Sequence, residues 1–342
     1  MEEVILVKDK IDIVIPWVDG NDIKWQNEKN KYKQKKDEKL NNSSRFRDWD
    51  NLQYIFRGIE KFMPWVNNIF FITWGHLPKW LNVDNPKLKI INHKDYIPSK
   101  YLPTFNSHTI ELNLYRIKDL SEKFIYFNDD TFVIDYMSES AFFKNGLPCD
   151  CGILNPIIPV GYDNFSNVSV NNLTIINEEF NKRTSIKKSI FNWYNIKYGS
   201  NLIRNFSLIP WGKFPGFYNG HLPNSFLKST FCEVWQKYEE TLDNTCSCHL
   251  RDNFTNVNQW LMRYWQLGKN QFYPRNPNFG KFYEITDNND NIINDIKSQK
   301  FKIVCLNDGI NINNFEKTKY EINEALSFVL PNKCSFEKSD TI

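Results

Sequence analysis

Short apolar runs rich in β-branched and aromatic residues recur along the first third of the chain. The runs with the length of a strand are 11–18 (IDIVIPWV), 68–75 (NIFFITWG), 88–92 (LKIIN) and 123–127 (KFIYF). Most positions in each run are apolar, with little alternation, which is typical of strands that are covered on both faces. We therefore predict buried strands at these four places.

Amphipathic segments lie between these runs. Apolar positions follow a helical spacing from Leu52 to Met63 and stop at Pro64, and a second helix is predicted over 107–120, with Ile110, Leu114 and Ile117 facing inward. Strands that alternate with helices predict an α/β fold with a mostly parallel, Rossmann-type sheet flanked by helices. Residues 27–44, polar and rich in lysine, are predicted to form a solvated helix or a surface connection.

The pattern changes after residue 149. Residues 150–220 lose the alternation and are rich in Asn, Pro and aromatic residues, with one helix predicted over 177–199. Its Lys182, Arg183, Lys187 and Lys188 could rest on a membrane or an acceptor chain, although a solvated cover helix is the simpler interpretation. We predict a single catalytic domain over residues 1–342, in which 150–220 is a mainly helical insertion or acceptor-side subregion.

Regular patterns return toward the end of the chain. Helices are predicted at 226–242, at 256–267 and at about 314–329, and a strand is predicted at 301–306 (FKIVCL). In the helix at 256–267, Val257, Trp260, Leu261, Tyr264 and Trp265 share one face.

Acidic side chains follow three of the predicted strands: Asp19 after the first, Asp129 and Asp130 after 123–127, and Asp308 after 301–306. Asp and Asn often end strands because they favour turns and helix caps. The carboxyl ends of parallel strands, however, meet at one edge of a sheet, where such folds bind their ligands. Grouped carboxylates there predict a site for Mg²⁺ or Mn²⁺ on Asp129, Asp130 and Asp308, and a diphosphate-containing substrate.

Other side chains fit such a substrate. Arg251 is a candidate phosphate clamp and His221 a candidate acid or base near neutral pH, although a surface ion pair and a loop histidine are the ordinary alternatives. Trp17 and Trp74 could stack on a base or a sugar ring, or serve only in the core.

Composition excludes several classes of protein. Lys and Arg number 43 against 40 Asp and Glu, a net charge of +3, so no overall field indicates a nucleic-acid partner. The amino-terminal sequence lacks the pattern of a signal peptide, and no window has the roughly 18 uncharged apolar residues of a spanning helix. The expectation is a cytoplasmic protein with reduced thiols that at most associates peripherally with the inner face of the membrane.

With these residues in view, the chain resembles the Stealth family of sugar-phosphate transferases, which includes bacterial capsular polysaccharide phosphotransferases and GlcNAc-1-phosphotransferase. The blocks that carry the resemblance are IDIVIPWVDGND (11–22), a long block from RFRDWDNL to FIYFNDDTFV (45–133), GHLPNSFLKSTFCEVWQ (220–236) with RDNF (251–254), and KIVCLNDG (302–309). His108 stands where the second block would have a small or apolar residue.

The resemblance implies a glycosyltransferase-like fold and transfer of a hexose 1-phosphate from a UDP-sugar to a hydroxyl of a glycan acceptor, with release of UMP. It implies roles for Asp129, Asp130, His221, Arg251 and Asp308, with the base left open among Asp129, Asp130 and His221. The expected setting is the synthesis of capsular or other cell-surface polysaccharide. The predicted substrate-binding residues are Trp17, Asp19, Gly20, Arg47, Trp74 and Asn128.

Two alternatives stay open. One is a metal-dependent glycosyltransferase that uses the Asp pair to hold its metal and releases UDP. The other is a carbohydrate-binding protein that uses its Trp and Tyr residues without turnover.

Overall fold

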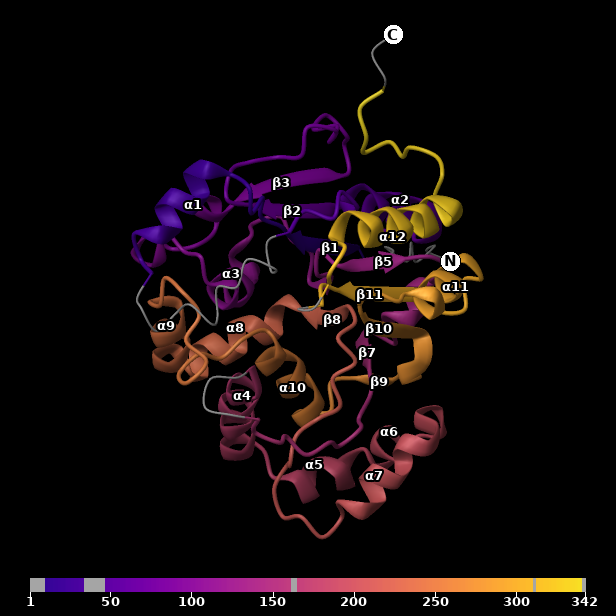
Figure 1. Ribbon diagram of the computed structural model, residues 1–342. Coiled ribbons are helices and arrows are strands. Elements are labelled where there is room, and N and C mark those ends of the chain that lie inside the picture. Colours follow the sequence, from indigo (N-terminus) through magenta and orange to yellow (C-terminus); the bar gives the residue numbers. More distant parts are fainter. Residues whose placement is uncertain (1–9, 34–46, 161–164, 310–311, 340–342) are drawn as a thin grey trace, which may run out of the picture.

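The computed structural model describes residues 10–33, 47–160, 165–309 and 312–339 (Figure 1). A five-stranded sheet lies at its centre. Its strands, in spatial order, are β3 (Leu88–Asn92), β2 (Ile69–Thr73), β1 (Ile11–Pro16), β4 (Lys123–Tyr126) and β8 (Asn224–Leu227). The first four are parallel and β8 is antiparallel to β4. The prediction of a mostly parallel α/β sheet is confirmed.

Two three-stranded sheets extend the structure on one side. One contains β10 (Gly280–Glu284), β11 (Ile303–Asn307) and β5 (Thr131–Val133), and the other β6 (Phe143–Lys144), β7 (Leu147–Asp150) and β9 (Tyr273–Pro274). The turn between β4 and β5 therefore carries the chain from the central sheet into the first of these sheets.

Helices cover both faces of the sheets. Their bounds are α1 (Ile23–Asn30), α2 (Leu52–Phe62), α3 (Ser107–Leu112), α4 (Phe165–Glu179), α5 (Lys182–Lys188), α6 (Ile190–Trp193), α7 (Leu202–Ser207), α8 (Lys228–Lys237), α9 (Glu239–Cys246), α10 (Trp260–Gly268), α11 (Asp290–Lys297) and α12 (Phe315–Val329). Short 3₁₀ turns lie at His93–Asp95, Ser99–Tyr101, Leu114–Arg116, Glu139–Ala141, Ile196–Asn201 and Pro277–Phe279. No helix in these described ranges is long and apolar enough to cross a membrane.

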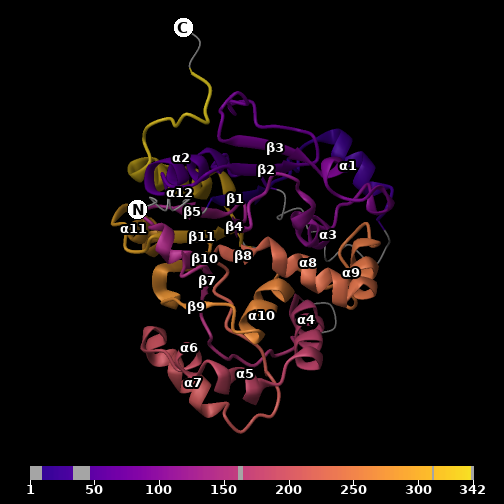
Figure 2. The same ribbon diagram turned by 180° about the vertical axis from the view of Figure 1, so that it is seen from behind.

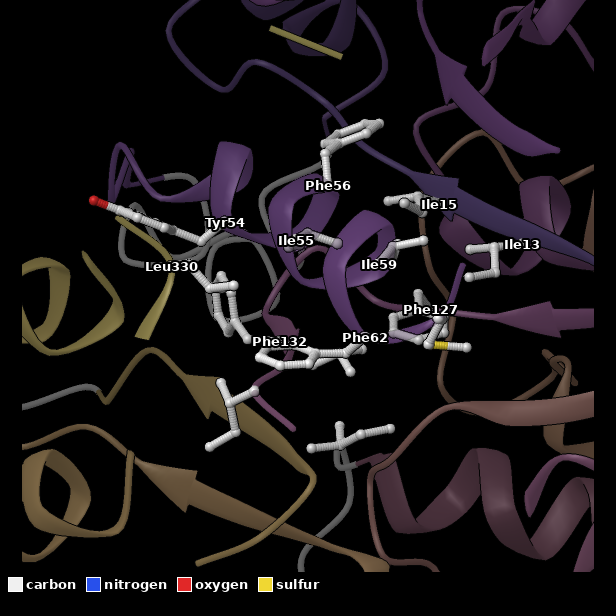
Figure 3. Packing of buried hydrophobic residues seen from close by; sticks show 14 of the residues in the cluster. Ile13, Ile15, Tyr54, Ile55, Phe56, Ile59, Phe62, Phe127, Phe132 and Leu330 are labelled. Carbon is white, nitrogen blue, oxygen red and sulfur yellow. The ribbon is translucent and has the colours of Figure 1, made fainter. Parts of the chain in front are cut away.

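Helix α2 shows how sequence pattern becomes packing. Its apolar face, including Ile55 and Ile59, packs against Ile13 and Ile15 of β1 and against Phe132 of β5 (Figure 3). Helix and strand approach so closely at Gly58 that an added Cβ atom would lie 2.3 Å from the backbone oxygen of Val133. The predicted amphipathic helix from Leu52 is confirmed.

Three other predicted helices are corrected by the structure. The helix over 107–120 is the short α3 followed by a 3₁₀ turn, because Asn113 leaves helical geometry and its side chain bonds the backbone oxygen of Thr109. The segment 226–242 begins as a strand, β8, which pairs with β4 before α8 and α9 follow. The segment 177–199 divides among the end of α4, α5 and α6, with the caps of Asn181 and Ser189 interrupting it.

The predicted solvated segment 27–44 is helical to Asn30, and residues 34–46 lie outside the described residues.

Helices α5, α6 and α7 form the lower end of the molecule in Figures 1 and 2. The Lys182 side chain is buried and donates to the backbone oxygens of Leu208 and Trp211, the latter at 2.7 Å. Asn205 of α7 donates to the backbone oxygens of Gly152 and Trp193. These hydrogen bonds thus hold the short helices to one another and to the segment that follows β7.

A buried carboxylate joins the amino ends of the three central strands. Asp12 of β1 is fully buried and accepts hydrogen bonds from the Asn67 side chain (2.7 Å), the Asn68 backbone N–H (3.1 Å) and the Ser121 backbone N–H (2.8 Å). Asn67 and Asn68 immediately precede β2, and Ser121 precedes β4. One side chain therefore satisfies donors at the start of both neighbouring strands.

Replacing Asp12 with Asn keeps the size of the side chain but leaves it a single acceptor oxygen for three donors. An unpaired buried donor costs about 1–3 kcal/mol, so we expect Asp12→Asn to lower the free energy of unfolding by about 2 kcal/mol in urea denaturation. The matched control is Asp119→Asn, which makes the same change of charge at an exposed position and should stay within about 0.5 kcal/mol of wild type. Equal losses in the two variants would contradict this role for Asp12.

Candidate active site

A cleft of about 600 Å³ opens beyond the carboxyl ends of β1 and β4, and the residues that end β11 form another part of its wall. The predicted residues that line it are Trp17, Asp19, Gly20, Arg47, Asn128, Asp129, Asp130, His221, Arg251 and Asp308. They come from segments far apart in the sequence, and the structure brings them together in one cleft. Their chemical roles stay predictions.

Trp74 is the exception. It is not among the side chains that line this cleft. The chain turns at Gly75 (φ 131°), so that His76, rather than Trp74, packs edge-on against Trp17, with ring centroids 5.3 Å apart. The ring centroids of Trp74 and His76 are 6.1 Å apart. The predicted contact of Trp74 with substrate stays a prediction.

His76 fixes the loop after β1, and sequence reasoning missed it. The backbone N–H of Asp19 donates to His76 Nε2 (2.7 Å), so the proton of the neutral ring is on Nδ1, which lies 3.1 Å from the Asp22 carboxylate. Asp22 also caps α1, and hydrogen bonds from the backbone of Trp25 and from His76 lower the pKa of its carboxyl. The contact joins two loops that are 57 residues apart in the sequence, so the role of His76 in holding the loop after β1 is seen only in the folded structure.

Asp129 is an exposed residue in the wall of the open cleft. Partial loss of contact with water and the charge of Asp130 raise the pKa of its carboxyl. A carboxylate crowded by protein and by a like charge is stabilised by a cation, which makes this position suitable for one.

Asp130 has different neighbours. One ligand atom of each of Asp130, His221 and Cys305 lies within 4.8 Å of the others. The backbone oxygen of Asp130 accepts from the Leu306 N–H (2.8 Å), which ties the β4–β5 turn to β11. His221 has a φ of 52°, in a region that non-glycine residues seldom adopt, and its ring packs against Phe282 at 5.2 Å. The surrounding structure thus holds a strained loop residue with its imidazole beside Asp130.

The residues around this pair fit a divalent metal ion. Asp129 and Asp130 supply carboxylate oxygens of the kind that hard cations take as ligands. His221 and Cys305 would add nitrogen and sulfur, which softer metals prefer, but burial raises the pKa of the Cys305 thiol, so it is protonated at neutral pH. The site is therefore a possible divalent-metal site, with its oxygen ligands on the acid pair.

Asp308, the third predicted ligand, is bound by an arginine. Arg47 Nε and Nη2 donate to its two carboxylate oxygens at 2.9 and 3.0 Å, and Nη2 also donates to the backbone oxygen of Gly309. The Arg47 guanidinium lies 5.1 Å from the Phe315 ring. This bidentate pair joins two segments of the cleft wall that are far apart in the sequence, so Asp308 serves in this structure as the partner of Arg47. Its role as a metal ligand stays a prediction.

Arg251 lies beside a buried carboxyl group that sequence reasoning missed. Its guanidinium donates to the Ser107 hydroxyl (2.7 Å), and Glu111, one helical turn further along α3, accepts from the Tyr126 hydroxyl and the Gln259 N–H at 3.3 Å each. Burial raises the pKa of Glu111 to about 7, although the nearby Arg251 opposes this rise. Ser107 and Glu111 are four residues apart, and this polar spacing on a short helix was the signal that could have revealed them.

His108, the unusual residue of the second block, lies in the cleft wall. Its side chain is buried, and burial together with the charge of Arg251 lowers its pKa to about 3, so the imidazole is neutral. Its Nδ1 has no hydrogen-bond partner among the described residues.

A second cavity of about 240 Å³ adjoins the cleft and shares Trp17, Asn128, Asp129 and Arg251 with it. Its remaining wall is more apolar and includes Trp25, Phe105, Ile110 and Tyr126. Acidic and basic groups thus lie at the junction of the two cavities, next to an aromatic pocket that has room for a flat ring.

Comparison with known proteins decides the family. Residues 9–37 match conserved region 1 of Stealth proteins, and residues 45–149 match conserved region 2. The chain is 44% identical over 332 residues to a capsular polysaccharide phosphotransferase WcwK of Streptococcus pneumoniae, covering 96% of this chain and 98% of the relative. The chain belongs to the Stealth family.

Other Stealth relatives are similar over the same length. The exopolysaccharide phosphotransferase cps2G of Lactiplantibacillus plantarum is 38% identical, covering 96% of each chain, and the receptor polysaccharide phosphotransferase WefC of Streptococcus oralis is 35% identical, covering 96% of this chain and 99% of the relative. The resemblance inferred from the sequence blocks is confirmed, and so, at the level of the family, is the prediction of a phosphotransferase.

The raised pKa of Glu111 predicts how stability depends on pH. The folded protein keeps the Glu111 proton up to a pH of about 7, whereas the unfolded chain releases it near pH 4.5. The raised pKa therefore contributes to the free energy of unfolding below pH 4.5, and this contribution is lost as the pH rises to 7. The difference between the pKa values of Glu111 in the folded and the unfolded chain corresponds to about 3 kcal/mol of free energy of unfolding. We expect Glu111→Gln to gain stability relative to wild type by up to this amount between pH 4.5 and 7.5, in urea denaturation at each pH.

The comparison variant for this experiment is Glu240→Gln, at an exposed position on α9. Its stability relative to wild type should stay constant over the same range of pH. If Glu111→Gln behaved like Glu240→Gln, Glu111 would titrate in the folded protein at its ordinary pKa.

Proposed function

We propose that this protein transfers a hexose 1-phosphate, with GlcNAc 1-phosphate the leading candidate, from a UDP-sugar to a hydroxyl of a glycan acceptor and releases UMP. The observation that carries the proposal is the single cleft in which Asp129, Asp130, His221 and Arg251 meet, in a chain whose full-length relatives are named polysaccharide phosphotransferases. The setting would be the synthesis of capsular or exopolysaccharide.

In the proposed reaction, the acceptor oxygen attacks the phosphorus on the sugar side of the diphosphate. A new phosphorus–oxygen bond forms as the bond to the oxygen of UMP breaks, so the sugar keeps its own C1–O bond. Such a transfer depends mainly on positioning and on neutralising charge on the phosphoryl oxygens. Arg251, which donates to Ser107 at the junction of the two cavities, would neutralise that charge.

His221 is the base that the geometry favours. A neutral imidazole can accept the hydroxyl proton, and the Asp130 carboxylate, with an oxygen within 4.8 Å of a ring nitrogen, would stabilise the charged ring that results. Asp129, which extends into the cleft, would then hold Mg²⁺ or Mn²⁺ together with Asp130. When bound, the ion supplies positive charge to the diphosphate.

The adjoining apolar cavity completes the proposal. A uracil ring is flat and polar at its edge, and the aromatic side chains Trp17 and Trp25 in the wall of this cavity offer stacking surfaces. The donor would thus lie with its base in the smaller cavity and its diphosphate at Arg251.

The nucleotide product tests the reaction class. Incubation with UDP-GlcNAc, Mg²⁺ and an acceptor glycan should release UMP in an amount equal to the phosphodiester formed, as measured by anion-exchange chromatography and ³¹P NMR. UDP without UMP would establish the rival, a metal-dependent glycosyltransferase. If no nucleotide appeared with any UDP-sugar while glycan still bound, the protein would be a binding module.

Two substitutions test the roles in the cleft. His221→Ala removes the proposed base and should lower kcat by about 10²- to 10³-fold with little change in KM for the donor. Arg251→Ala removes positive charge that is needed most in the transition state, so kcat/KM should fall by at least about 10²-fold. The matched control is Arg204→Ala, at an exposed position outside the cleft, which should keep the wild-type kcat/KM. If His221→Ala kept a wild-type kcat, Asp129 or Asp130 would be the base.

A further inference from the structure

Large apolar side chains gather on the exposed surface of the lower lobe, which we define as residues 182–213, comprising α5, α6, α7 and the turns between and after them. They are between 52% and 88% exposed: Phe191, Ile196, Ile203, Phe206, Ile209 and Trp211. Single exposed apolar residues are ordinary on a protein surface, but so many on short adjoining helices mark an interaction site.

These side chains are not left over from an incomplete core. The lobe buries Trp193 and Tyr198, and Asn205 and Lys182 fasten its helices through hydrogen bonds to backbone oxygens. These buried contacts hold the lobe together, and the six exposed apolar side chains, including Phe191, point into solvent.

The charge of the lobe has one sign. No acidic residue occurs in the sequence between Glu179 and Glu233. Arg183, Lys187 and Lys188 of α5 are exposed, and none of them pairs with a carboxylate in the part of the chain that the structure describes. The chain as a whole carries a net charge of only +3, so this positive region is local.

We propose that the lower lobe binds the surface of an anionic phospholipid bilayer. Branched aliphatic and aromatic side chains flanked by unpaired lysine and arginine are the combination that enters the boundary between headgroups and acyl chains, with the cations against acidic headgroups. The protein would lie on the membrane by this lobe without spanning it.

Two other occupants fit less well. A second copy of the chain would bring like charges together across a symmetric interface, which opposes association. A glycan would be recognised through hydrogen-bonding groups and flat aromatic faces, whereas Ile196, Ile203 and Ile209 offer neither. The proposal goes beyond the sugar-phosphate transfer and does not depend on it.

Co-sedimentation of the full chain with vesicles tests the proposal. Vesicles that contain phosphatidylglycerol should carry the protein down, vesicles of pure phosphatidylcholine should bind it much less, and binding should weaken as the salt concentration rises. The triple variant Phe191→Ser/Ile196→Ser/Phe206→Ser should lower the partition coefficient by at least about tenfold, and Lys187→Glu/Lys188→Glu should remove the preference for anionic lipid.

The matched control is Tyr320→Ser/Phe328→Ser on α12, where the two side chains are 69% and 66% exposed outside the lobe. It should bind vesicles as wild type does, and thermal melting should show that all variants are folded. The proposal is overturned if wild type stays in the supernatant with anionic vesicles, or if the lobe variants bind as the control does. Sedimentation equilibrium that showed a dimer lost in the triple variant, or retention on a glycan resin but not on vesicles, would assign the lobe to those partners instead.

UMP release in detergent-free solution from a donor and a soluble acceptor separates this proposal from the proposed function. The lobe variants should keep the wild-type rate there. Loss of vesicle binding with normal turnover, or the reverse, therefore distinguishes failure of one proposal from failure of the other.

Discussion

The arrangement of the cleft depends on one buried carboxylate at the opposite edge of the sheet. Asp12 accepts donors that precede β2 and β4, and so aligns the amino ends of three neighbouring parallel strands. Because the strands are short and of similar length, alignment at one edge also sets where they end at the other. The loops that carry Trp17 and the acid pair start from those ends. Packing of α2 against the same strands then makes their spacing rigid.

Among the described residues that line the cleft, acidic side chains outnumber the two arginines, Arg47 and Arg251. The pKa values of Asp129 and Glu111 are both raised, in Asp129 partly by the charge of Asp130, and the positive charge of Arg251 opposes both rises. Arg47 is already engaged with Asp308. A positive charge bound beside these carboxyl groups would reduce the repulsion among them.

Local patterns were sufficient to predict the strands, because apolar runs at 11–18, 68–75, 88–92 and 123–127 need no information beyond their own composition. The acids after these strands could also be foreseen, since parallel strands end at one edge. The divided helices could not, because side-chain caps such as that of Asn181, rather than periodicity, end each piece. His76 and Asp12 were missed because their partners lie far away in the sequence, whereas Glu111 left a local sign, its spacing of four residues from Ser107. That His76, and not Trp74, packs against Trp17 could not be foreseen either, because it depends on the turn at Gly75.

The Arg47–Asp308 pair joins residues that are 261 positions apart. During synthesis, β11 and the Asp308 that follows it leave the ribosome only when nearly the whole chain has been made, whereas β1, β2 and β4 are complete much earlier. A nascent or truncated chain that ends before β11 lacks one wall of the cleft, and it leaves Arg47 without its partner. The connectivity of the fold therefore delays completion of the cleft until translation is almost finished, and an unfinished chain has only part of its wall.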